Sequence, residues 1–302
     1  MKGHLALIVV VAALLASCAP VDLNAPVPVY DTGIDPNAWA DVPAGEFFFG
    51  QHEAVQTTDA YSIMVTDVTV AQYVEFLNAA LTAGEVRIGE FKEQPAIVGN
   101  YPGDEFRGVK HEEEIAAGDW IFVPLEDAAS RFTFDGTAFA AKPGYEQHPM
   151  TNVSWFGAWG YCGYYDWRLP TEMEWEKAAR GTDTRPFPWG EEIARNNANF
   201  YSSRDPFEDM RTFGSRTSPV GFYNGRTYDS YATLDSASPY GLYDMAGNVW
   251  QWTGDVYEGM HLRFMRGGSK DTYDMDLRVW VRNNATPTYY SPGVGFRCVD
   301  AP

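Results

Sequence analysis

The stretch HPMTNVSWFGAWGYCGYYDWRLPTEMEWEKAARG, residues 148–181, contains two segments with the start and stop signals of helices. Ser154 is a suitable N-cap for the first segment, which carries Cys162. Thr171 and Glu174 have the spacing of a capping box at the start of the second segment, and Gly181 is a typical residue for its end. The stretch therefore predicts two short helices that follow each other in the chain.

The residues before this stretch indicate a mixture of strands and one further helix. From Trp39 onward, short alternating apolar runs separated by Gly and polar turns favour strands. Thr69 and Gln72 form another capping-box pattern, and one apolar stripe follows it at helical spacing. The stripe consists of Val70, Tyr73, Val74 and Leu77. Residues 85–147 are less regular and rich in acids, so we interpret them as an insertion within one domain, with a hairpin turn at Asp135-Gly136.

Composition indicates a globular protein built from short elements. Of the 302 residues, 45% are hydrophobic and 15% aromatic, which is enough for a packed core. The 28 glycines and 19 prolines are spread over the whole length, as expected for many turns. The formal net charge of −19 makes nucleic acids and anionic lipid head groups poor partners, whereas divalent cations remain plausible. A solvated acidic surface that keeps the protein soluble explains the charge equally well.

The N-terminus has the order of features found in a bacterial lipoprotein signal. Lys2 precedes the apolar run Leu5–Leu15, and small residues then lead to Cys18. This order predicts a signal peptide over residues 1–17, acylation of Cys18, and a tether over residues 18–38. We then expect a lipid-anchored protein of the bacterial cell envelope, on the outer membrane, that contacts the bilayer only through its anchor. An ordinary secretory signal is the alternative.

Cys162 and Cys298 are the two cysteines of the exported part, and in an oxidising compartment such a pair favours a disulfide. No histidine pairs with Cys162 or with a serine at the spacing of a known catalytic motif. The sequence also lacks a glycine loop of the kind that binds phosphate. Residue patterns alone therefore point to no catalytic couple.

Nine segments occur in the order seen in one protein family: VPAGEFFFG, DVTVAQYVEFLNAA, the opening stretch, FPWG, NANF, SPVGFYNG, SPYGLYDMAGNVWQWTGD, RFMRGGS and GVGFRC. In these segments the chain resembles the formylglycine-generating, or sulfatase-modifying factor, family. The resemblance covers residues 39–302 and implies a single α+β domain of the C-type-lectin-like kind, low in regular secondary structure. It also implies the family disulfide, which would join Cys162 to Cys298.

The resemblance further implies structural calcium ions. One site would use the side chain of Asp244, the carbonyls of Gly247 and Val249, and the side chain of Gln251, which replaces the glutamate usual in the family. A second site would use Asn199, the carbonyl of Phe200 and either Asp205 or Asp209. Loops held only by their own turn hydrogen bonds are the alternative for both sites.

Copper is not expected. The oxidases of this family hold copper(I) with two cysteine thiolates in the loop after RGGS, which here corresponds to residues 266–269. No cysteine lies between Ser269 and Arg297 in this chain. Hydroxyl, carboxylate and phenol groups do not replace thiolates as copper(I) ligands. The copper oxidase chemistry of the family is therefore predicted to be absent.

Three interpretations remain. In the first, the domain is a non-catalytic binding or structural module whose cleft takes an envelope protein, a peptide or a glycan. In the second, it is an oxidoreductase of the same family that uses other residues, as in the branch that matures siderophores. In the third, it is a receptor diversified at its C-terminal loop. We favour the first, and the predicted ligand-binding residues are Trp250, Ser269, Lys270, Asp271, Tyr273, Trp280, Arg282 and Asn283.

Overall fold

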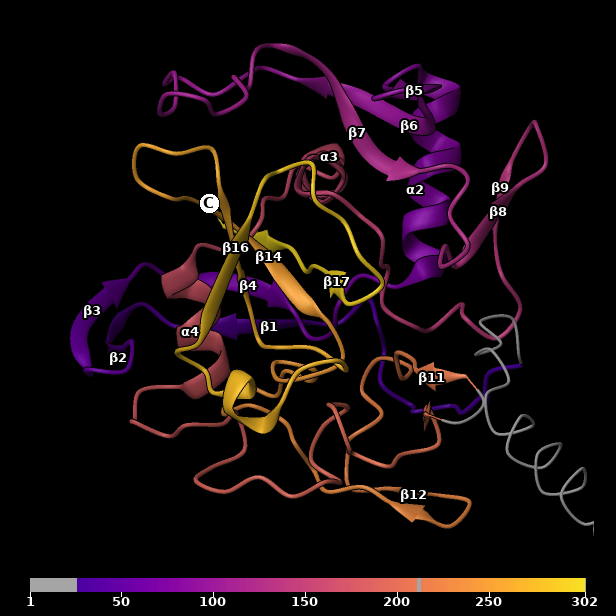
Figure 1. Cartoon of the computed structure of the whole chain (residues 1–302). Helices are drawn as coiled ribbons and strands as arrows, with labels where there is room; N and C mark the ends of the chain where they lie inside the picture. Colours follow the sequence, from indigo (N-terminus) through magenta and orange to yellow (C-terminus); the bar gives the residue numbers. More distant parts are fainter. Residues whose placement is uncertain (1–25, 211–212, 302) are drawn as a thin grey trace, which may run out of the picture.

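One small sheet brings together the two ends of the domain (Figure 1). The computed structural model describes residues 26–210 and 213–301. In this sheet β4 (Tyr61–Met64) lies between β1 (Trp39–Val42) and β18 (Val299–Asp300), and both pairings are antiparallel. A four-stranded sheet has the order β16-β15-β14-β17 and includes β14 (Trp250–Val256), β15 (Arg263–Arg266), β16 (Arg282–Ala285) and β17 (Val294–Gly295). Both sheets pair segments distant in sequence, so neither forms without tertiary folding.

The three predicted helices are confirmed as α2 (Val70–Ala83), α3 (Trp155–Tyr164) and α4 (Glu172–Arg180). Thr69 caps α2 and Thr171 caps α4, each through a complete capping box. The Ser154 side chain accepts a hydrogen bond from the Gly157 amide at the start of α3. Gly181 ends α4 with a φ of 76°, a conformation that glycine adopts without strain. Local hydrogen bonds thus set the limits of these helices.

The other elements are short. They comprise the hairpin β2 (Gly45–Phe49) with β3 (Ala54–Thr58), the two-residue pairs β10 (Glu208–Asp209) with β11 (Gly214–Ser215) and β12 (Thr227–Tyr228) with β13 (Tyr231–Ala232), and the 3-10 helix η2 (Asp274–Leu277). Extended loops connect them in the lower half of Figure 1. The predicted α+β class with little regular secondary structure is confirmed.

Residues 85–147 are more ordered than we expected. They form an antiparallel sheet, β5 (Val86–Phe91), β6 (Gln94–Tyr101) and β7 (Gly118–Pro124), and the hairpin β8 (Phe132–Phe134) with β9 (Phe139–Ala141). The predicted turn at Asp135-Gly136 joins β8 to β9. Ile97 and Val123 belong to the main hydrophobic core, so this section is not a loosely attached insertion. Its many exposed acids concealed the apolar face of the sheet in the sequence.

The main core lies between α2, α3 and this sheet. The Phe122 ring of β7 lies so close to α3 that a Cβ atom on Gly160 would be only 2.4 Å from it. The Phe122 carbonyl also accepts a hydrogen bond from the Ser154 amide, at 2.9 Å. Glycine at this point lets the helix approach the sheet, and this approach places α3 above the four-stranded sheet (Figure 1).

The predicted tether is shorter than residues 18–38. Val27 is buried, and the Tyr30 ring packs against the rings of Phe207, Phe222 and Tyr228. Residues 26–38 are therefore part of the domain, because an aromatic side chain anchors them to it. The predicted signal peptide, Cys18 and the first residues of the predicted tether lie outside the described part of the chain. Within the described ranges, no helix has the length and apolar character needed to cross a bilayer.

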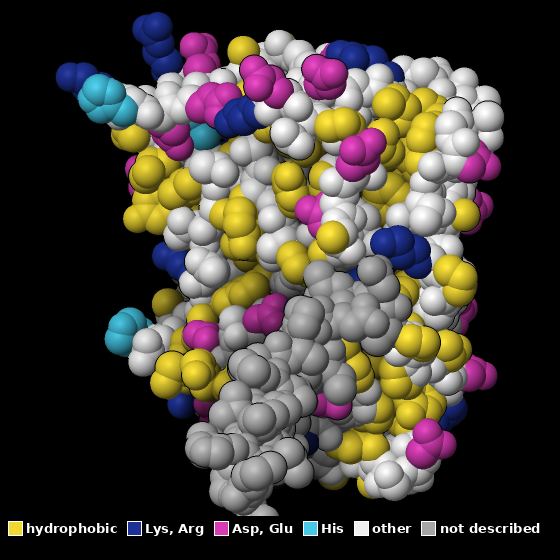
Figure 2. Space-filling model, turned by 45° about the vertical axis from the view of Figure 1, so that its right-hand side comes forward, with side chains coloured by type: hydrophobic (Ala, Val, Ile, Leu, Met, Phe, Trp, Pro, Cys, Tyr) yellow, Lys and Arg dark blue, Asp and Glu magenta, His cyan; other side chains and the backbone are white. Residues whose placement is uncertain are grey.

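The visible surface mixes acidic and apolar side chains. Figure 2 shows acidic groups spread over one face, with hydrophobic side chains between them and fewer basic groups. This distribution agrees with the sequence, in which 41 acidic residues outnumber 22 Lys and Arg. The acidic groups on this face are dispersed, so they form no single charged patch there.

Candidate binding cleft

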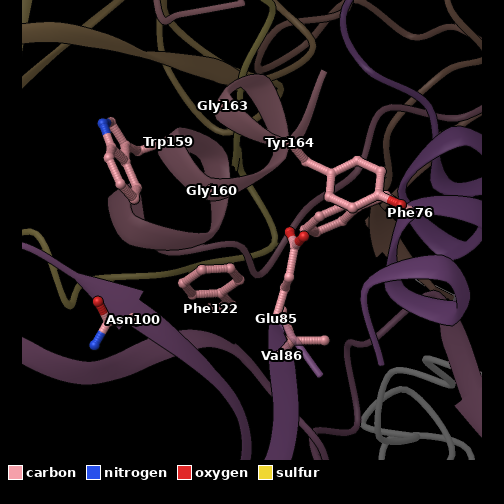
Figure 3. Close-up of a pocket in the computed structure, with 9 residues that line it drawn as sticks. All are labelled: Phe76, Glu85, Val86, Asn100, Phe122, Trp159, Gly160, Gly163 and Tyr164. Carbon is pink, nitrogen blue, oxygen red and sulfur yellow. The ribbon is translucent and has the colours of Figure 1, made fainter. Parts of the chain in front are cut away.

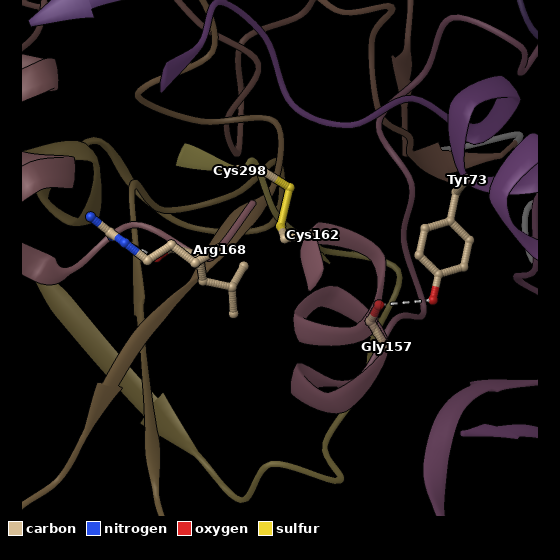
Figure 4. Close-up of a disulfide and its surroundings, with 6 residues drawn as sticks. Tyr73, Gly157, Cys162, Arg168 and Cys298 are labelled. Carbon is tan, nitrogen blue, oxygen red and sulfur yellow. Dashed lines mark hydrogen bonds between the residues drawn. A yellow bond between two sulfur atoms is a disulfide. The ribbon is translucent and has the colours of Figure 1, made fainter. Parts of the chain in front are cut away.

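A disulfide ties the helical region to the C-terminal strand. Cys162 of α3 and Cys298, just before β18, are bonded with a Cα–Cα distance of 5.7 Å (Figure 4). Next to it, the Tyr73 hydroxyl of α2 donates a hydrogen bond to the Gly157 carbonyl of α3, at 3.1 Å. The predicted Cys162–Cys298 pairing is confirmed, and both domain cysteines are consumed by it.

A cavity of about 360 Å³ lies on the four-stranded sheet, beside the loop that follows β15. Trp250, the first residue of β14, forms one wall and is 8% exposed. Its backbone amide donates to the carbonyl of Gly293, which also lines the cavity, at 2.8 Å. Asn283 of the edge strand β16 contributes a side-chain amide. The sheet thus presents one aromatic ring beside polar groups.

Two glycines allow the loop after β15 to turn toward the cavity. Gly267 and Gly268 have φ values of 94° and 72°, and a Cβ atom on Gly268 would lie 2.8 Å from the Leu277 side chain of η2. The chain can therefore turn back sharply between β15 and η2. Ser269 follows at the turn, and its hydroxyl accepts a hydrogen bond from the Asp271 amide at 3.3 Å. The turn places the Ser269 and Asp271 side chains at the cavity wall.

Of the eight predicted ligand-binding residues, Trp250, Ser269, Asp271 and Asn283 line this cavity. Lys270 lies behind the wall: its side chain is only 6% exposed, and its ammonium contacts the Asp271 carboxylate at 2.5 Å. Because the Asp271 side chain is 53% exposed, the carboxylate remains accessible to a ligand despite this ion pair.

The other three predicted residues do not line this cavity, because each contacts a partner elsewhere. Tyr273 points outward, 60% exposed, and its ring lies 5.1 Å from the Tyr201 ring. Trp280 packs under the Arg180 guanidinium. Arg282 forms an ion pair with the carboxylate of Glu172 in α4. None of these partners is close in sequence to the residue that it holds.

Sequence reasoning missed eight residues of the cavity wall. They are Met265, Thr272, Asn284, Ala285, Tyr289, Ser291, Gly293 and Val294. Asn284 adjoins the predicted Asn283, so proximity in the sequence could have identified it. The segment from Tyr289 to Val294 gave no signal, because only the parallel pairing of β17 with β14 brings it to the cavity.

The proposed ligands of the first calcium site do not all fit a cation. The side-chain oxygen of Gln251 already accepts hydrogen bonds from the Trp175 indole and from the Arg297 guanidinium, both at 2.8 Å. Its amide nitrogen donates to the Asp244 carbonyl. Burial raises the pKa of the Asp244 carboxyl to about 6, while the Gly221 amide and Arg297 act in the opposite direction. The Arg297 guanidinium thus supplies a positive charge where the calcium ion was expected. The side-chain oxygen of Gln251 is already occupied by its two hydrogen bonds.

The second predicted site fits a cation better. The side-chain oxygen of Asn199 is buried and has no hydrogen-bond partner among the described residues. Such an oxygen is costly unless something binds it. Asp205 is engaged elsewhere, since its carboxylate accepts hydrogen bonds from the Phe207 amide and from the hydroxyls of Ser203 and Tyr223.

The cavity wall contains neither a thiolate nor an imidazole. In the described part of the chain, no cluster of three or more His, Cys, Asp or Glu side chains is arranged to hold a metal. The wall instead combines an aromatic ring with hydroxyl, carboxylate and amide groups. Groups of this kind bind ligands by stacking and hydrogen bonding.

The model of the sulfatase-modifying factor enzyme 1-like domain family matches residues 34–302. The chain belongs to this family. The match begins before residue 39, in agreement with the packing of residues 26–38 on the domain. The family membership places the loop after β15 at the position where the resemblance put the copper-binding cysteines, and this member has none there.

Curated relatives include active and inactive members. The formylglycine-generating enzyme of Mus musculus is 27% identical over 292 residues, which cover 85% of this chain and 73% of that protein. The inactive C-alpha-formylglycine-generating enzyme 2 of Mus musculus is 37% identical over 161 residues, 51% of this chain and 49% of that protein. The serine/threonine-protein kinase pkn1 of Chlamydia caviae matches 52% of this chain at 37% identity, but only 25% of its own length is covered. The chain thus spans half or less of these last two relatives.

Solved structures confirm the sulfatase-modifying-factor fold. PvdO from Pseudomonas aeruginosa superposes with a TM-score of 0.55 at 22% identity, covering 91% of this chain and 98% of that one. Variable protein 1 of Treponema denticola superposes with a TM-score of 0.51 at 20% identity, covering 92% and 100%. At such identities the likeness shows the fold alone.

Proposed function

We propose that this protein is a non-catalytic binding module that recognises a peptide or glycan segment in the cavity on the four-stranded sheet. The observation that carries the proposal is the chemistry of the cavity wall. It offers the Trp250 ring for stacking, and Ser269, Asp271 and Asn283 for hydrogen bonds, but no thiolate and no imidazole. The 37% identical stretch in a relative named as inactive supports the same conclusion.

The two other interpretations have less support. Both the siderophore-maturation-like oxidoreductase and the diversified receptor rest on likeness of fold, at 22% and 20% identity. The cavity wall contains no thiolate and no imidazole that could act as a metal ligand or as a nucleophile and base couple. A binding module requires only the aromatic, hydroxyl, carboxylate and amide groups that line the cavity.

We further propose that the module is attached to the bacterial envelope through acylated Cys18, with its acidic domain facing away from anionic lipids. The signal-like order of residues 1–18 supports this location. Detergent partitioning of the full chain, compared with the Cys18→Ser variant, tests the anchor. Equal partitioning of the two proteins would contradict it.

A ligand found by screening peptide and glycan arrays should depend on the cavity. Asn283→Ala and Trp250→Phe should each weaken its binding by roughly 1 kcal/mol, because a hydrogen bond or a stacking surface is lost. Tyr273→Ala is the matched control and should leave the affinity unchanged, since this exposed ring lies outside the cavity. If neither cavity variant changed the affinity, the ligand would bind at another site. Copper-dependent oxygen uptake with a cysteine peptide would support the enzyme instead.

Calcium should stabilise the domain through the site at Asn199. At a concentration one hundred times its dissociation constant, a bound ion adds about 2.7 kcal/mol to the free energy of unfolding. Thermal unfolding with calcium and with chelator measures this shift. In Asn199→Ala the shift should vanish, because the buried side-chain oxygen is removed. Gln251→Leu should lower the melting temperature but should still be stabilised by calcium. If calcium no longer stabilised this variant, the ion would belong to the first predicted site, at Asp244 and Gln251.

A further inference from the structure

A second cavity, separate from the cleft, lies between α2, α3 and the β5-β6-β7 sheet (Figure 3). Its volume is about 400 Å³, within the range of small-molecule sites. Four aromatic rings line it: those of Phe76, Phe122, Trp159 and Tyr164. It shares no residue with the cleft on the four-stranded sheet. The two cavities are therefore distinct sites.

Two glycines of α3 keep the second cavity open. The Phe122 ring fills the space next to Gly160, where an added Cβ atom would collide with it. One turn further along, an added Cβ atom on Gly163 would meet nothing within 4 Å. The space beside Gly163 is therefore open, and Gly163 itself is exposed at this wall of the cavity.

Glu85 is the one charged residue in this cavity wall. It follows Gly84, the left-handed C-cap of α2, and Figure 3 shows its carboxylate directed toward the Tyr164 ring. Among the described residues, this carboxylate makes no hydrogen bond and no ion pair. Asn100 supplies the other polar side chain, and no Lys, Arg or His lines the cavity.

We propose that this cavity binds an organic ammonium ion with an aromatic or branched apolar body. The apolar body would contact the buried Phe76 and Phe122 rings, and the ammonium would face the Glu85 carboxylate and the π-faces above it. Glu85 is exposed at the rim of the cavity, where its carboxylate would repel a carboxylate ligand and attract an ammonium group. The net charge of −19 also favours a cation over an anion.

Phenethylammonium tests the proposal with the full chain. Isothermal titration should detect saturable binding that is about tenfold stronger than that of neutral 3-phenylpropanol, since the ion pair and the cation–π contacts are lost in the alcohol. The anion 3-phenylpropionate should not bind. Absence of saturable binding of phenethylammonium up to about 10 mM, or equal binding of the alcohol, would overturn the proposal.

Two variants localise the binding. Glu85→Gln should weaken phenethylammonium binding about tenfold while keeping the size of the side chain. Glu90→Gln is the matched control, because Glu90 is an exposed glutamate of β5, the strand that begins directly after Glu85, and lies outside the cavity. Gly163→Leu should fill the cavity and abolish binding without lowering the melting temperature, since helical glycine is itself unfavourable. Unchanged binding in Gly163→Leu would show that the ammonium ion binds elsewhere.

Discussion

Removing the disulfide is expected to lower the free energy of unfolding by about 4–5 kcal/mol, because the bond between Cys162 and Cys298 closes a loop with a sequence separation of 136. In the chain-entropy model, a loop of that length strongly restricts the unfolded chain. The change is Cys162→Ala together with Cys298→Ala, measured by urea unfolding. Alanine avoids placing a free thiol or a hydroxyl in a position where both side chains are fully buried.

The wild-type protein with its disulfide reduced is the control for this experiment. It should unfold at a urea concentration close to that of the double variant, since both lack the same constraint. A double variant within about 1 kcal/mol of the oxidised protein would show that the bond adds little beyond packing.

The second large effect is expected from Arg266→Met, which should destabilise the fold by about 3–5 kcal/mol. Arg266 is buried, with its side chain 1% exposed, and its guanidinium contacts the carboxylates of Glu172 and Glu176 and the Val279 carbonyl. Burial raises the pKa of the Glu176 carboxyl, whereas Arg266 and Arg180 oppose that rise. Without Arg266, Glu176 would retain Arg180 as its one basic partner in a dry environment.

Arg282→Met is the matched control, because Arg282 pairs with the same Glu172 while its own side chain is 51% exposed. An exposed pair contributes little, so this variant should cost less than about 1 kcal/mol. Denaturant unfolding of both variants measures the difference. If both variants lowered the free energy of unfolding equally, burial of the ion pair would not explain the contribution of Arg266 to stability.

Contacts with α4 also explain why two of the predicted residues lie outside the cavity. Arg282 and Trp280 were predicted for the cleft from their place in the loop, yet Glu172 and Arg180 of α4 hold them away from it. Glu172 and Arg180 lie about a hundred residues earlier in the chain, and no local pattern links them to that loop. Four of the eight predicted residues line the cavity, because they follow β15 or belong to β14 and β16, which form its floor.

The sequence by itself determined the features that depend on neighbouring residues. The capping boxes of α2 and α4, the Ser154 cap and the turn at Asp135-Gly136 are local hydrogen-bond or backbone preferences. The disulfide was also predictable, because only two cysteines follow the predicted signal peptide and its Cys18.

Tertiary structure alone decided the features that depend on partners distant in the chain. It showed that Tyr30 anchors residues assigned to a tether, and that Trp175 and Arg297 occupy the Gln251 oxygen expected to bind calcium. It also revealed the second cavity, which exists because the Phe122 ring lies beside Gly160 and leaves the space at Gly163 open. The physical reason is that a cap is satisfied within one helical turn, whereas a buried side chain takes its partners from whichever segments the complete fold brings to it.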